Sequence, residues 1–567
     1  MRRLALIGLL PGLLLTARAD IFVDGSAGPG GDGSTAHPFA AIQQGLDHAK
    51  AGDSVIVRPG VYHEQIKLNH GGTAQAPLTL RAEKIGTVTV DGAAPVTDLT
   101  QDSWRTQVGV AVWRSTSYAS PYMPMKDPWG LRDAWLKEGP TGAEQVELCS
   151  RNDMVWLDGR FLTQVDTPQE LASGTFYIDR DAHTLEIALP AGDSPAQHRV
   201  EVARLGTLFM TENGASFVHV RGFHFTRSAS GYGMPVARFG NYATTGWVVA
   251  DNVADYGSWG GMGLYGSHNL ILRNVAAHNG CEGISGIIHD TVLDGNATLY
   301  NNWKGIRDTY ESGGGKFTES ARVLVRNHEA AYNRGPGIWF DINNSDITLD
   351  HVRAHDDHYA GIFIEISPGP AVVRDCQCWG NAGAGITIGE SNQALLENNV
   401  LNQNWDGIEL RNLPDRHGPF GEGATKDDHS FQISDVTIRG NYFYHNAKAG
   451  LAATAAYLDP VGRHIASDHN IFFDNTPMRW CAARPNDALN GFVPAQVTSA
   501  NVNGYWIFPS LEGMAKFGFD QHSRADDPQL VNEYMYGAKG AAALPRATEP
   551  AAPKAPELPQ GVPEFHP

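Results

Sequence analysis

Cysteine is scarce in this chain, which has five cysteines in 567 residues. They are too few and too scattered for a disulfide framework, and an odd number leaves at least one without an intramolecular partner. Cys376 and Cys378 stand two residues apart, so both would point to the same face of a strand. We interpret them as core or turn residues and not as metal ligands.

The motifs that bind nucleotides or catalytic zinc are also missing. The chain has no phosphate-binding P-loop, no His-Glu-x-x-His, no Cys-x-x-Cys and no Gly-x-Ser-x-Gly elbow. We therefore expect no nucleotide cofactor, no structural zinc and no nucleophile of the α/β-hydrolase type.

Basic residues are in the minority. There are 43 Lys and Arg against 62 Asp and Glu, which gives a formal net charge of -19. Nucleic-acid binding needs a basic stripe, so we expect no nucleic-acid partner. An acidic protein can still have a locally basic groove, and an anionic glycan therefore stays compatible with this charge.

Long apolar runs are confined to the N-terminus. Arg2 and Arg3 precede an apolar run from Leu4 to Leu15, and Ala17-Arg18-Ala19 has the small-x-small pattern of a cleavage site. This is the pattern of a signal peptide, so we predict cleavage after Ala19 and a secreted or periplasmic protein. No later run reaches the roughly 18 apolar residues of a membrane span.

What the chain does contain is a repeated glycine followed by an apolar residue. The pairs are Gly261-Met262, Gly283-Ile284, Gly305-Ile306, Gly337-Ile338, Gly361-Ile362, Gly385-Ile386 and Gly407-Ile408. The intervals between them are 22, 22, 32, 24, 24 and 22 residues. A period of about 20 to 30 residues indicates stacked supersecondary units.

The repeating unit consists of short strands. Segments such as Ile347-Thr348-Leu349 precede a polar residue, Gly-Ile follows it, and no segment of the unit has helical spacing. The polar residues are Asn274, Asn296, Asn327, His351, Asp375 and Asn399. We expect them to stack from coil to coil at a corner, where their side chains satisfy backbone groups of the turn. The pattern predicts a three-sided parallel β-coil.

This combination resembles the right-handed parallel β-helix of the pectin-lyase-like superfamily, over roughly residues 40 to 95 and 205 to 530. The stretch from Gly52 to Tyr62 is similar to the first coil of many secreted β-helix proteins. The resemblance implies an all-β fold, a right-handed parallel β-helix solenoid, in a carbohydrate-active protein. It implies no single reaction, because that scaffold carries lyases, hydrolases, esterases and non-catalytic proteins.

The pattern divides the chain into five segments. Residues 1–19 are the signal peptide, and residues 20–97 hold the first coils and a capping helix within Phe39–Lys50 that covers the open end. Residues 98–204 lose the period and gain aromatic residues, which predicts an inserted antiparallel β lobe. Residues 205–535 form the main solenoid, and the Pro- and Ala-rich residues 541–567 form a disordered tail.

Alternation along each strand predicts which residues face outward. If the apolar residues of Gly-Ile-x-Φ-x point inward, the second and fourth residues after the glycine point outward. These are Arg307 and Thr309, Trp339 and Asp341, Phe363 and Glu365, Thr387 and Gly389, then Glu409 and Arg411. A row with aromatics, carboxylates and arginines is typical of a sugar-binding groove, in which Trp339 and Phe363 would stack on sugars.

Asp341 and Glu365 are the predicted catalytic pair. They stand 24 residues apart in one column, so we expect them on adjacent coils with Cα atoms about 4.8 Å apart. Carboxyl groups about 5 to 5.5 Å apart fit a retaining glycosidase, whereas about 6.5 to 9.5 Å fits an inverting one. We predict Asp341 as nucleophile or base and Glu365 as acid, with the reverse order open. If Glu409, two coils from Glu365, is the true partner, inversion is favoured.

The same carboxylates have a non-catalytic interpretation. They would then pair with Arg307, Arg411 or Lys316, or bind calcium. Lys316 follows three glycines that permit a turn close to the groove. It would contact a substrate carboxylate or, if burial lowers its pKa, act as the base of a lyase. A solvated loop lysine is the plainer interpretation.

Together these features predict a secreted glycoside hydrolase that acts on a polysaccharide or oligosaccharide as a monomer, without a cofactor. The predicted catalytic residues are Asp341, Glu365 and Lys316, and the predicted substrate-binding residues are Trp339, Phe363, Arg307, Glu409, Arg411 and Tyr310. One alternative is a polysaccharide lyase that cleaves a uronic-acid glycan by β-elimination, for which calcium is an option. Another is a non-catalytic glycan-binding solenoid.

Overall fold

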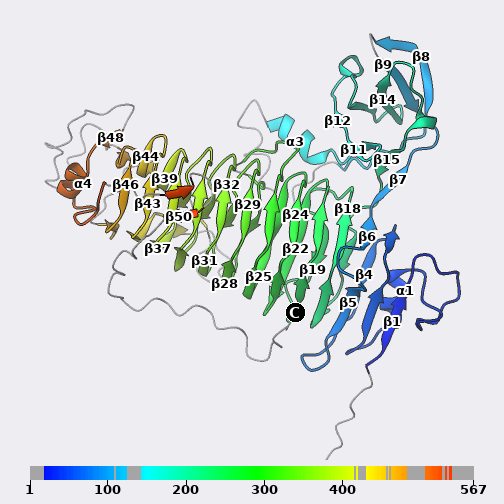
Figure 1. The fold of residues 1–567 in the computed structure, drawn as a ribbon, viewed down its shortest axis with the longest axis horizontal. Coiled ribbons are helices and arrows are strands. Elements are labelled where there is room, and N and C mark those ends of the chain that lie inside the picture. The colour runs from blue at the N-terminus through cyan, green and yellow to red at the C-terminus, as the bar shows by residue number, and fades with distance from the viewer. Residues whose placement is uncertain are drawn as a thin grey trace, which may run out of the picture.

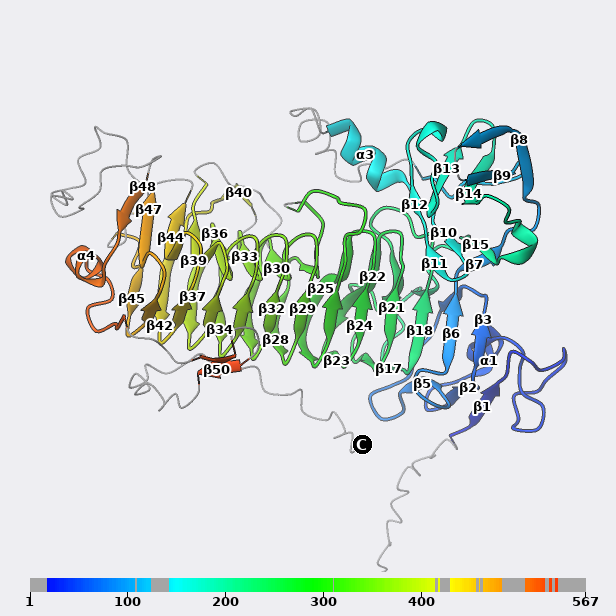
Figure 2. The same ribbon diagram turned by 45° about the horizontal axis from the view of Figure 1, so that its top comes forward.

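A computed structural model describes residues 18–107, 110–123, 142–308, 310–413, 417–418, 429–454, 458, 462–481, 505–525, 530–532 and 536–538. The described residues form a long parallel β-coil with a lobe beside its N-terminal strands and the helix α4 (Leu511–Phe517) at the other end, as Figures 1 and 2 both show. The predicted fold class, an all-β right-handed parallel β-helix solenoid, is confirmed.

Three faces make up the coil. The first face holds β4 (Ile66–Leu68), β16 (Phe209–Thr211), β19 (Pro235–Phe239), β22 (Gly260–Ser267), the start of β25 (Glu282–Asp294), β27 (Lys316–Phe317), β30 (Ile338–Asp341), β33 (Ile362–Glu365), β36 (Ile386–Gly389), β39 (Asp406–Arg411), β44 (Ala449–Thr454) and β47 (Met478–Cys481). The second face holds β1 (Asp20–Val23), β2 (Ser54–Val57), β5 (Leu78–Ala82), β17 (Val218–Arg221), β20 (Val248–Ala250), β23 (Leu270–Leu272), the end of β25, β28 (Ala321–Arg326), β31 (Ser345–Asp350), β34 (Ala371–Arg374), β37 (Asn392–Glu397), β42 (Ser434–Arg439) and β45 (Ala466–Asp468). The third face holds β3 (Gly60–Tyr62), β6 (Val88–Asp91), β18 (Phe223–Thr226), β21 (Val253–Asp255), β24 (Val275–Ala277), β26 (Ala297–Leu299), β29 (Glu329–Ala331), β32 (Arg353–His355), β35 (Gln377–Trp379), β38 (Val400–Asn402), β43 (Tyr442–Tyr444) and β46 (Ile471–Phe473).

The repeated glycine has a steric cause. A Cβ on Gly361 would lie 2.8 Å from the Asn381 amide nitrogen and 2.9 Å from the Gly385 carbonyl oxygen. Only glycine therefore lets the chain enter each first-face strand this close to the next coil. The apolar residues that follow, such as Ile362 and Ile364, are buried in the continuous core.

Asparagine side chains stack at two corners of the coil. At the first corner the ladder comprises Asn252, Asn274, Asn296, Asn399, Asn441 and Asn470. The prediction is right for Asn274, Asn296 and Asn399. It is wrong for Asn327, His351 and Asp375, which lie exposed one residue earlier with positive φ. The inward positions of those coils belong to His328, Val352 and Cys376.

A second ladder contains one carboxylate where its neighbours have amides. It comprises Asn279, Asn301, Asn333, Asp357, Asn381, Asn404 and Asn446. Asp357 Oδ1 accepts from the backbone and side chain of Asn333, both at 2.9 Å. Asp357 Oδ2 is buried and has no hydrogen-bond partner within the described part of the chain. Asn381, one coil on, uses the equivalent nitrogen to donate to the Ala354 carbonyl at 3.0 Å.

We expect Asp357→Asn to stabilise the protein, and more so at alkaline pH. Burial raises the pKa of Asp357 to about 8, against about 3.9 in an unfolded chain. The folded state therefore binds the extra proton, and this residue makes the free energy of unfolding fall as pH rises from about 4 to about 8. The amide of Asn can donate a hydrogen bond at this buried position without binding a proton. We therefore expect the substitution to raise the free energy of unfolding by about 1 to 3 kcal/mol at pH 8.

The measurement is urea unfolding of both proteins at pH 5 and pH 8. Asp346→Asn, at an exposed corner position, is the matched control and should change neither value. A variant that is no more stable than the wild type at pH 8 would contradict this reading of the ladder.

The inserted lobe consists of two small sheets. One holds β7 (Ala93–Pro95), β10 (Val155–Leu157), β11 (Arg160–Phe161) and β15 (Val200–Ala203), and the other holds β8 (Thr100–Gln107), β9 (Val110–Ser115), β12 (Thr163–Gln164), β13 (Thr175–Asp179) and β14 (Thr184–Pro190). All their pairings are antiparallel except β12 with β13. The helix α3 (Gly142–Ser150) precedes β10.

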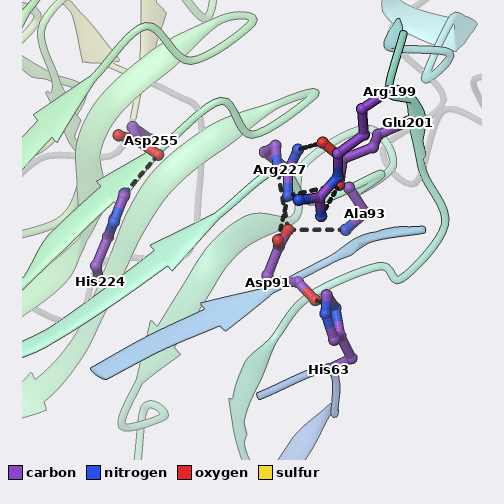
Figure 3. Close-up of polar contacts among 8 residues, drawn as sticks. All are labelled: His63, Asp91, Ala93, Arg199, Glu201, His224, Arg227 and Asp255. Carbon is purple, nitrogen blue, oxygen red and sulfur yellow. Dashed lines mark hydrogen bonds and ion pairs between the residues drawn. The ribbon is translucent and has the colours of Figure 1, made fainter. Parts of the chain in front are cut away.

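Figure 3 shows the ion cluster that joins the lobe to the coil. Arg227, after β18, lies between Asp91 at the end of β6 and Glu201 in β15. Its Nε donates to Asp91 Oδ1 at 2.9 Å, and its Nη1 donates to Glu201 Oε2 at 2.9 Å. The two carboxylates are buried, with side-chain exposures of 4% and 5%. One partly buried guanidinium thus holds a strand of the lobe against two strands of the coil.

The two ends of the coil carry short helices. α1 (Ile42–His48) buries Ile42 and Leu46 against the first strands. At the far end, β48 (Tyr505–Phe508) pairs antiparallel with β47. Further along the chain, β49 (Leu530–Asn532) pairs antiparallel with β50 (Tyr536–Ala538). In the part of the chain that the structure describes, no helix has the length and apolar character needed to cross a membrane.

Candidate active site

The first face brings the predicted catalytic pair together. β30 and β33 pair in parallel, with Asp341 directly opposite Glu365 and Trp339 opposite Phe363. The next two coils continue these columns, so that Gly389 and then Arg411 follow Glu365. The neighbouring column continues from Phe363 through Thr387 to Glu409.

Arg307 was placed in this row wrongly. The glycine that aligns with the repeat is Gly314, whose added Cβ would lie 2.1 Å from the Gly337 carbonyl. The chain rejoins the first face at Lys316, which pairs with Trp339. Arg307 is exposed in the preceding segment, and Thr309 lies outside the described residues. Lys316 therefore occupies the position that the sequence pattern assigned to Arg307.

Asp341 and Glu365 are buried, each 4% exposed, and each contacts a cation. Lys316 Nζ lies 2.9 Å from Asp341 Oδ2 and 3.2 Å from Glu311 Oε1. Arg411 Nη2 forms an ion pair with Glu365 and lies 3.2 Å from Glu390 Oε2. The contacts foreseen under the non-catalytic interpretation are therefore present for Lys316 and Arg411, and the two neighbouring carboxylates lie between these two cations.

Gly389 makes the long reach of Arg411 possible. A Cβ on Gly389 would lie 3.1 Å from Arg411 Nη2, so the absence of a side chain leaves room for the guanidinium to pass over that coil to Glu365. Arg411 Nη1 also donates to the Tyr359 hydroxyl at 3.0 Å. Glu390, which is fully buried, contacts Arg411 Nη2, the atom that also pairs with Glu365, and accepts from the Leu413 amide at 2.7 Å.

The two aromatic residues of the row are not open platforms for sugar. Trp339 and Phe363 are 2% and 1% exposed and stack on each other with ring centroids 5.2 Å apart. Lys316 Nζ lies 4.1 Å from the Trp339 ring centre, and the Arg411 guanidinium lies 4.8 Å from that of Phe363. The predicted stacking role is therefore wrong: these rings support the two cations by cation–π contact.

Glu409 and Tyr310 lie beside this cluster. Glu409 accepts hydrogen bonds from Thr387 at 3.2 Å and from Thr454 at 2.6 Å. The Tyr310 hydroxyl lies 2.7 Å from that of Tyr232, and its carbonyl accepts from Lys316 at 3.3 Å. Both residues border the row, and their predicted contacts with substrate stay predictions.

Electrostatics argue against Lys316 as a base. Burial alone would lower the pKa of Lys316, but the Asp341 and Glu311 carboxylates outweigh it and raise the pKa above its ordinary value. A lysine acts as a general base only if its amine is unprotonated at the working pH. Lys316 is instead a fixed positive charge, and the condition under which it would act as a base, a lowered pKa, is not met.

Glu282 is a candidate that the sequence reasoning missed. It is 5% exposed, and burial followed by the neighbouring Glu311 carboxylate raises its pKa to about 8. It therefore carries a proton at neutral pH. Glu282 directly precedes a repeat glycine and so falls outside the outward columns, which is why the pattern gave no signal for it. Glu390 was not predicted either, because it follows the last residue of β36 and so also falls outside the outward columns.

Three buried polar atoms of this row have no hydrogen-bond partner within the described part of the chain: Trp339 Nε1, Asp341 Oδ1 and Arg411 Nε. Buried polar atoms without partners are rare in folded proteins. All three atoms are buried, so a ligand could satisfy them only after neighbouring side chains move.

Comparison with known protein families supports the architecture. The model for the right-handed β-helix region matches residues 240–401 and 371–488, and the model for chondroitinase B matches residues 38–100. The structure of XylC in complex with xylose superimposes with a TM-score of 0.65 at 16% identity, covering 81% of this chain and 84% of that one.

Curated relatives match only over short stretches. Pectate lyase PEL9 of Emericella nidulans is 36% identical over 76 residues, which is 13% of this chain and 18% of that protein. The uncharacterized protein YwoF of Bacillus subtilis is 29% identical over 72 residues, 13% of this chain and 15% of that protein. The chain thus covers less than a fifth of the length of either relative.

Proposed function

Because the chain has the right-handed parallel β-helix fold of the pectin-lyase-like superfamily, we propose that it is a carbohydrate-active enzyme, a glycoside hydrolase that retains the anomeric configuration. The observation that carries this proposal is the vertical pair of Asp341 and Glu365 on adjacent coils. Parallel neighbours lie about 4.8 Å apart, which suits the separation of about 5 to 5.5 Å in retaining enzymes.

In the proposed reaction Asp341 is the nucleophile. Its Oδ2 is held by Lys316, while Oδ1 has no partner among the described residues. Oδ1 forms a bond to the anomeric carbon as the glycosidic bond breaks, and Glu365 gives its proton to the departing oxygen. Glu365 then takes a proton from water, whose oxygen attacks the anomeric carbon and releases Asp341. The two carboxyl groups supply every step, so the proposal includes no cofactor.

The charge balance of the row allows Glu365 to carry the proton. Arg411 faces the carboxylates of both Glu365 and Glu390, and Lys316 faces those of both Asp341 and Glu311. Two cations thus face four carboxyl groups. A proton on Glu365 would reduce the repulsion among the four carboxyl groups.

The same pairings favour a neutral glycan over a uronic-acid glycan. A lyase needs a base and a free cation that neutralises the substrate carboxylate. Lys316 is charged and, like Arg411, already paired with carboxylates. We therefore propose a neutral oligosaccharide as substrate, and the likeness of the fold to XylC makes xylo-oligosaccharides the first to assay. Because the N-terminal residues have the pattern of a signal peptide, we also propose that the enzyme acts outside the cytoplasm.

The test is an assay of the purified protein against a panel of neutral and uronic-acid glycans. We expect new reducing ends from a neutral substrate, no ultraviolet absorbance, and a first product with the anomeric configuration of the substrate in proton NMR. An unsaturated, ultraviolet-absorbing product would replace this proposal by the lyase. An inverted product would reject the pairing of Asp341 with Glu365.

Lys316→Met should lower kcat and move the acid limb of the pH profile upward. The substitution leaves a buried carboxylate without its cation, and such a carboxylate takes up a proton more readily. Loss of one preorganised charge typically lowers kcat by about 10²- to 10³-fold. The measurement is kcat/KM as a function of pH for Lys316→Met and for Lys316→Arg. The arginine variant keeps the charge and should keep the acid limb in place, whereas equal shifts in both variants would speak against an electrostatic role.

A further inference from the structure

A cluster of two histidines and one aspartate lies outside the first face, at the last described corner of the second face. Asp468 ends β45, His469 follows it, and His522 comes from a segment 53 residues further along the chain. One ligand atom from each lies within 4.8 Å of the others. The two imidazole rings stack with centroids 5.2 Å apart.

Both histidines face the same carboxylate. His522 Nδ1 lies 2.7 Å from Asp468 Oδ2, and His469 Nδ1 lies 3.5 Å from that oxygen. The side chains are 34% to 66% exposed, so an ion can reach them from solvent. Imidazole nitrogen with one carboxylate oxygen is a donor set that zinc accepts, whereas calcium and magnesium prefer oxygen alone.

The segment that contributes His522 takes the place of a further coil. The Asp520 amide donates to the Ser467 carbonyl at 2.6 Å, and the Arg524 amide donates to the Asn470 carbonyl at 2.9 Å. Arg524 also forms a parallel bridge with Ile471 of β46. The end of a solenoid needs such a cover, because its last strands would otherwise present unpaired edges.

From this juxtaposition we propose that Asp468, His469 and His522 bind a zinc-type divalent cation that clips the segment 520–524 onto the last coil. Water completes the coordination sphere. Because the ion joins residues from distant parts of the chain, it binds only when the segment 520–524 lies against the last coil. This metal is structural, separate from the proposed reaction, and no zinc motif of the sequence predicts it.

A second cluster at the equivalent corner supplies the control. Asp350, His351 and Asp375 lie equally close together, but this group has one imidazole, and Asp350 is held by Arg374 at 2.8 Å. One imidazole with two carboxylates is a poorer donor set for zinc than two imidazoles, and Arg374 competes with a metal ion for Asp350. His351→Gln therefore removes a corner histidine beside an aspartate without touching the proposed site.

The experiment is a calorimetric titration of metal-stripped, tag-free, full-length protein with zinc chloride. We expect a single micromolar site that is lost in His522→Gln and in His469→Gln and kept in His351→Gln, with no binding of magnesium. Zinc that binds the His522→Gln variant as tightly as the wild type would overturn the assignment.

A second measurement tests the clip and does not depend on catalysis. Hydrogen exchange followed by mass spectrometry reports the amides of Asp520 and Arg524 directly. Zinc should slow exchange of peptides that cover these residues in the wild type and in His351→Gln, but not in His522→Gln. Zinc bound without slower exchange would overturn the clip, because the ion would then sit on the surface without closing the cap.

Discussion

Asp341→Gly should abolish turnover, and azide should restore it with a product of opposite anomeric configuration. Removal of a catalytic nucleophile lowers kcat by roughly 10⁴- to 10⁶-fold. The small variant leaves space beside Lys316, where an azide anion replaces the carboxylate of Asp341 and attacks the anomeric carbon from the same side. With a nitrophenyl glycoside of the substrate sugar, the product would be the inverted glycosyl azide, identified by NMR.

Glu365→Ala should behave differently in the same assay. General acid–base catalysis contributes about 10²- to 10⁴-fold, and a nitrophenolate needs little protonation to leave, so the covalent intermediate still forms. Azide then attacks that intermediate and gives a glycosyl azide of retained configuration. The two products together decide which carboxylate is the nucleophile; exchanged outcomes would reverse the roles.

Asp350→Asn is the control for both variants. Asp350 is also an outward carboxylate with a cation on the next coil, since Arg374 lies 2.8 Å away, but it belongs to the second face. Its loss should leave kcat unchanged. If Asp341→Gly and Glu365→Ala keep full activity while folding normally, the row is an ion-pair network and the solenoid acts elsewhere or only binds glycans.

The adjacency of Asp341 and Glu365 could be predicted because sterics fix it. Each repeat glycine is required because the next coil lies so close. Side chains alternate along a strand, so counting from that glycine gives the inward and outward positions. Between residues 303 and 316 the pattern selects Gly305, which is followed by Ile306, whereas the glycine that aligns with the repeat is Gly314, which is followed by Gly315. Asn302 decides between them by accepting the Ile306 amide at 2.8 Å in a local turn, and the repeat pattern does not contain that contact.

For Asn327, His351 and Asp375, the sequence pattern pointed to the residue just before the true ladder position. Each corner has an outward residue with positive φ followed by an inward one. Where the outward residue is polar and the inward one is Val352 or Cys376, a search for polar residues selects the wrong position. The ion pairs of Lys316 and Arg411 were foreseen as the non-catalytic alternative, but the pattern could not decide for them, because they depend on side chains that cross from one coil to another, as over Gly389.

Arg227→Met should destabilise the junction between lobe and coil by about 3 to 5 kcal/mol, the usual effect of leaving buried charges without their partner. Asp91 would lose its guanidinium partner, and Glu201 would keep only its contact with the exposed Arg199 among the cations that the structure describes (Figure 3). Their side chains are nearly inaccessible, so water cannot replace it. Urea unfolding followed by tryptophan fluorescence measures the loss, since Trp156 packs in the lobe with Arg227 5.4 Å from its ring centre.

Arg199→Met is the matched control, because Arg199 contacts the same Glu201 carboxylate at 2.7 Å but is 68% exposed. An exposed pair contributes about 0 to 1 kcal/mol, so this variant should remain close to the wild type. Combining Arg227→Met with Asp91→Asn and Glu201→Gln should recover most of the lost stability, since neutral amides no longer need a cation. If the triple variant is no more stable than Arg227→Met, the loss comes from packing against Trp156 and not from the stranded carboxylates.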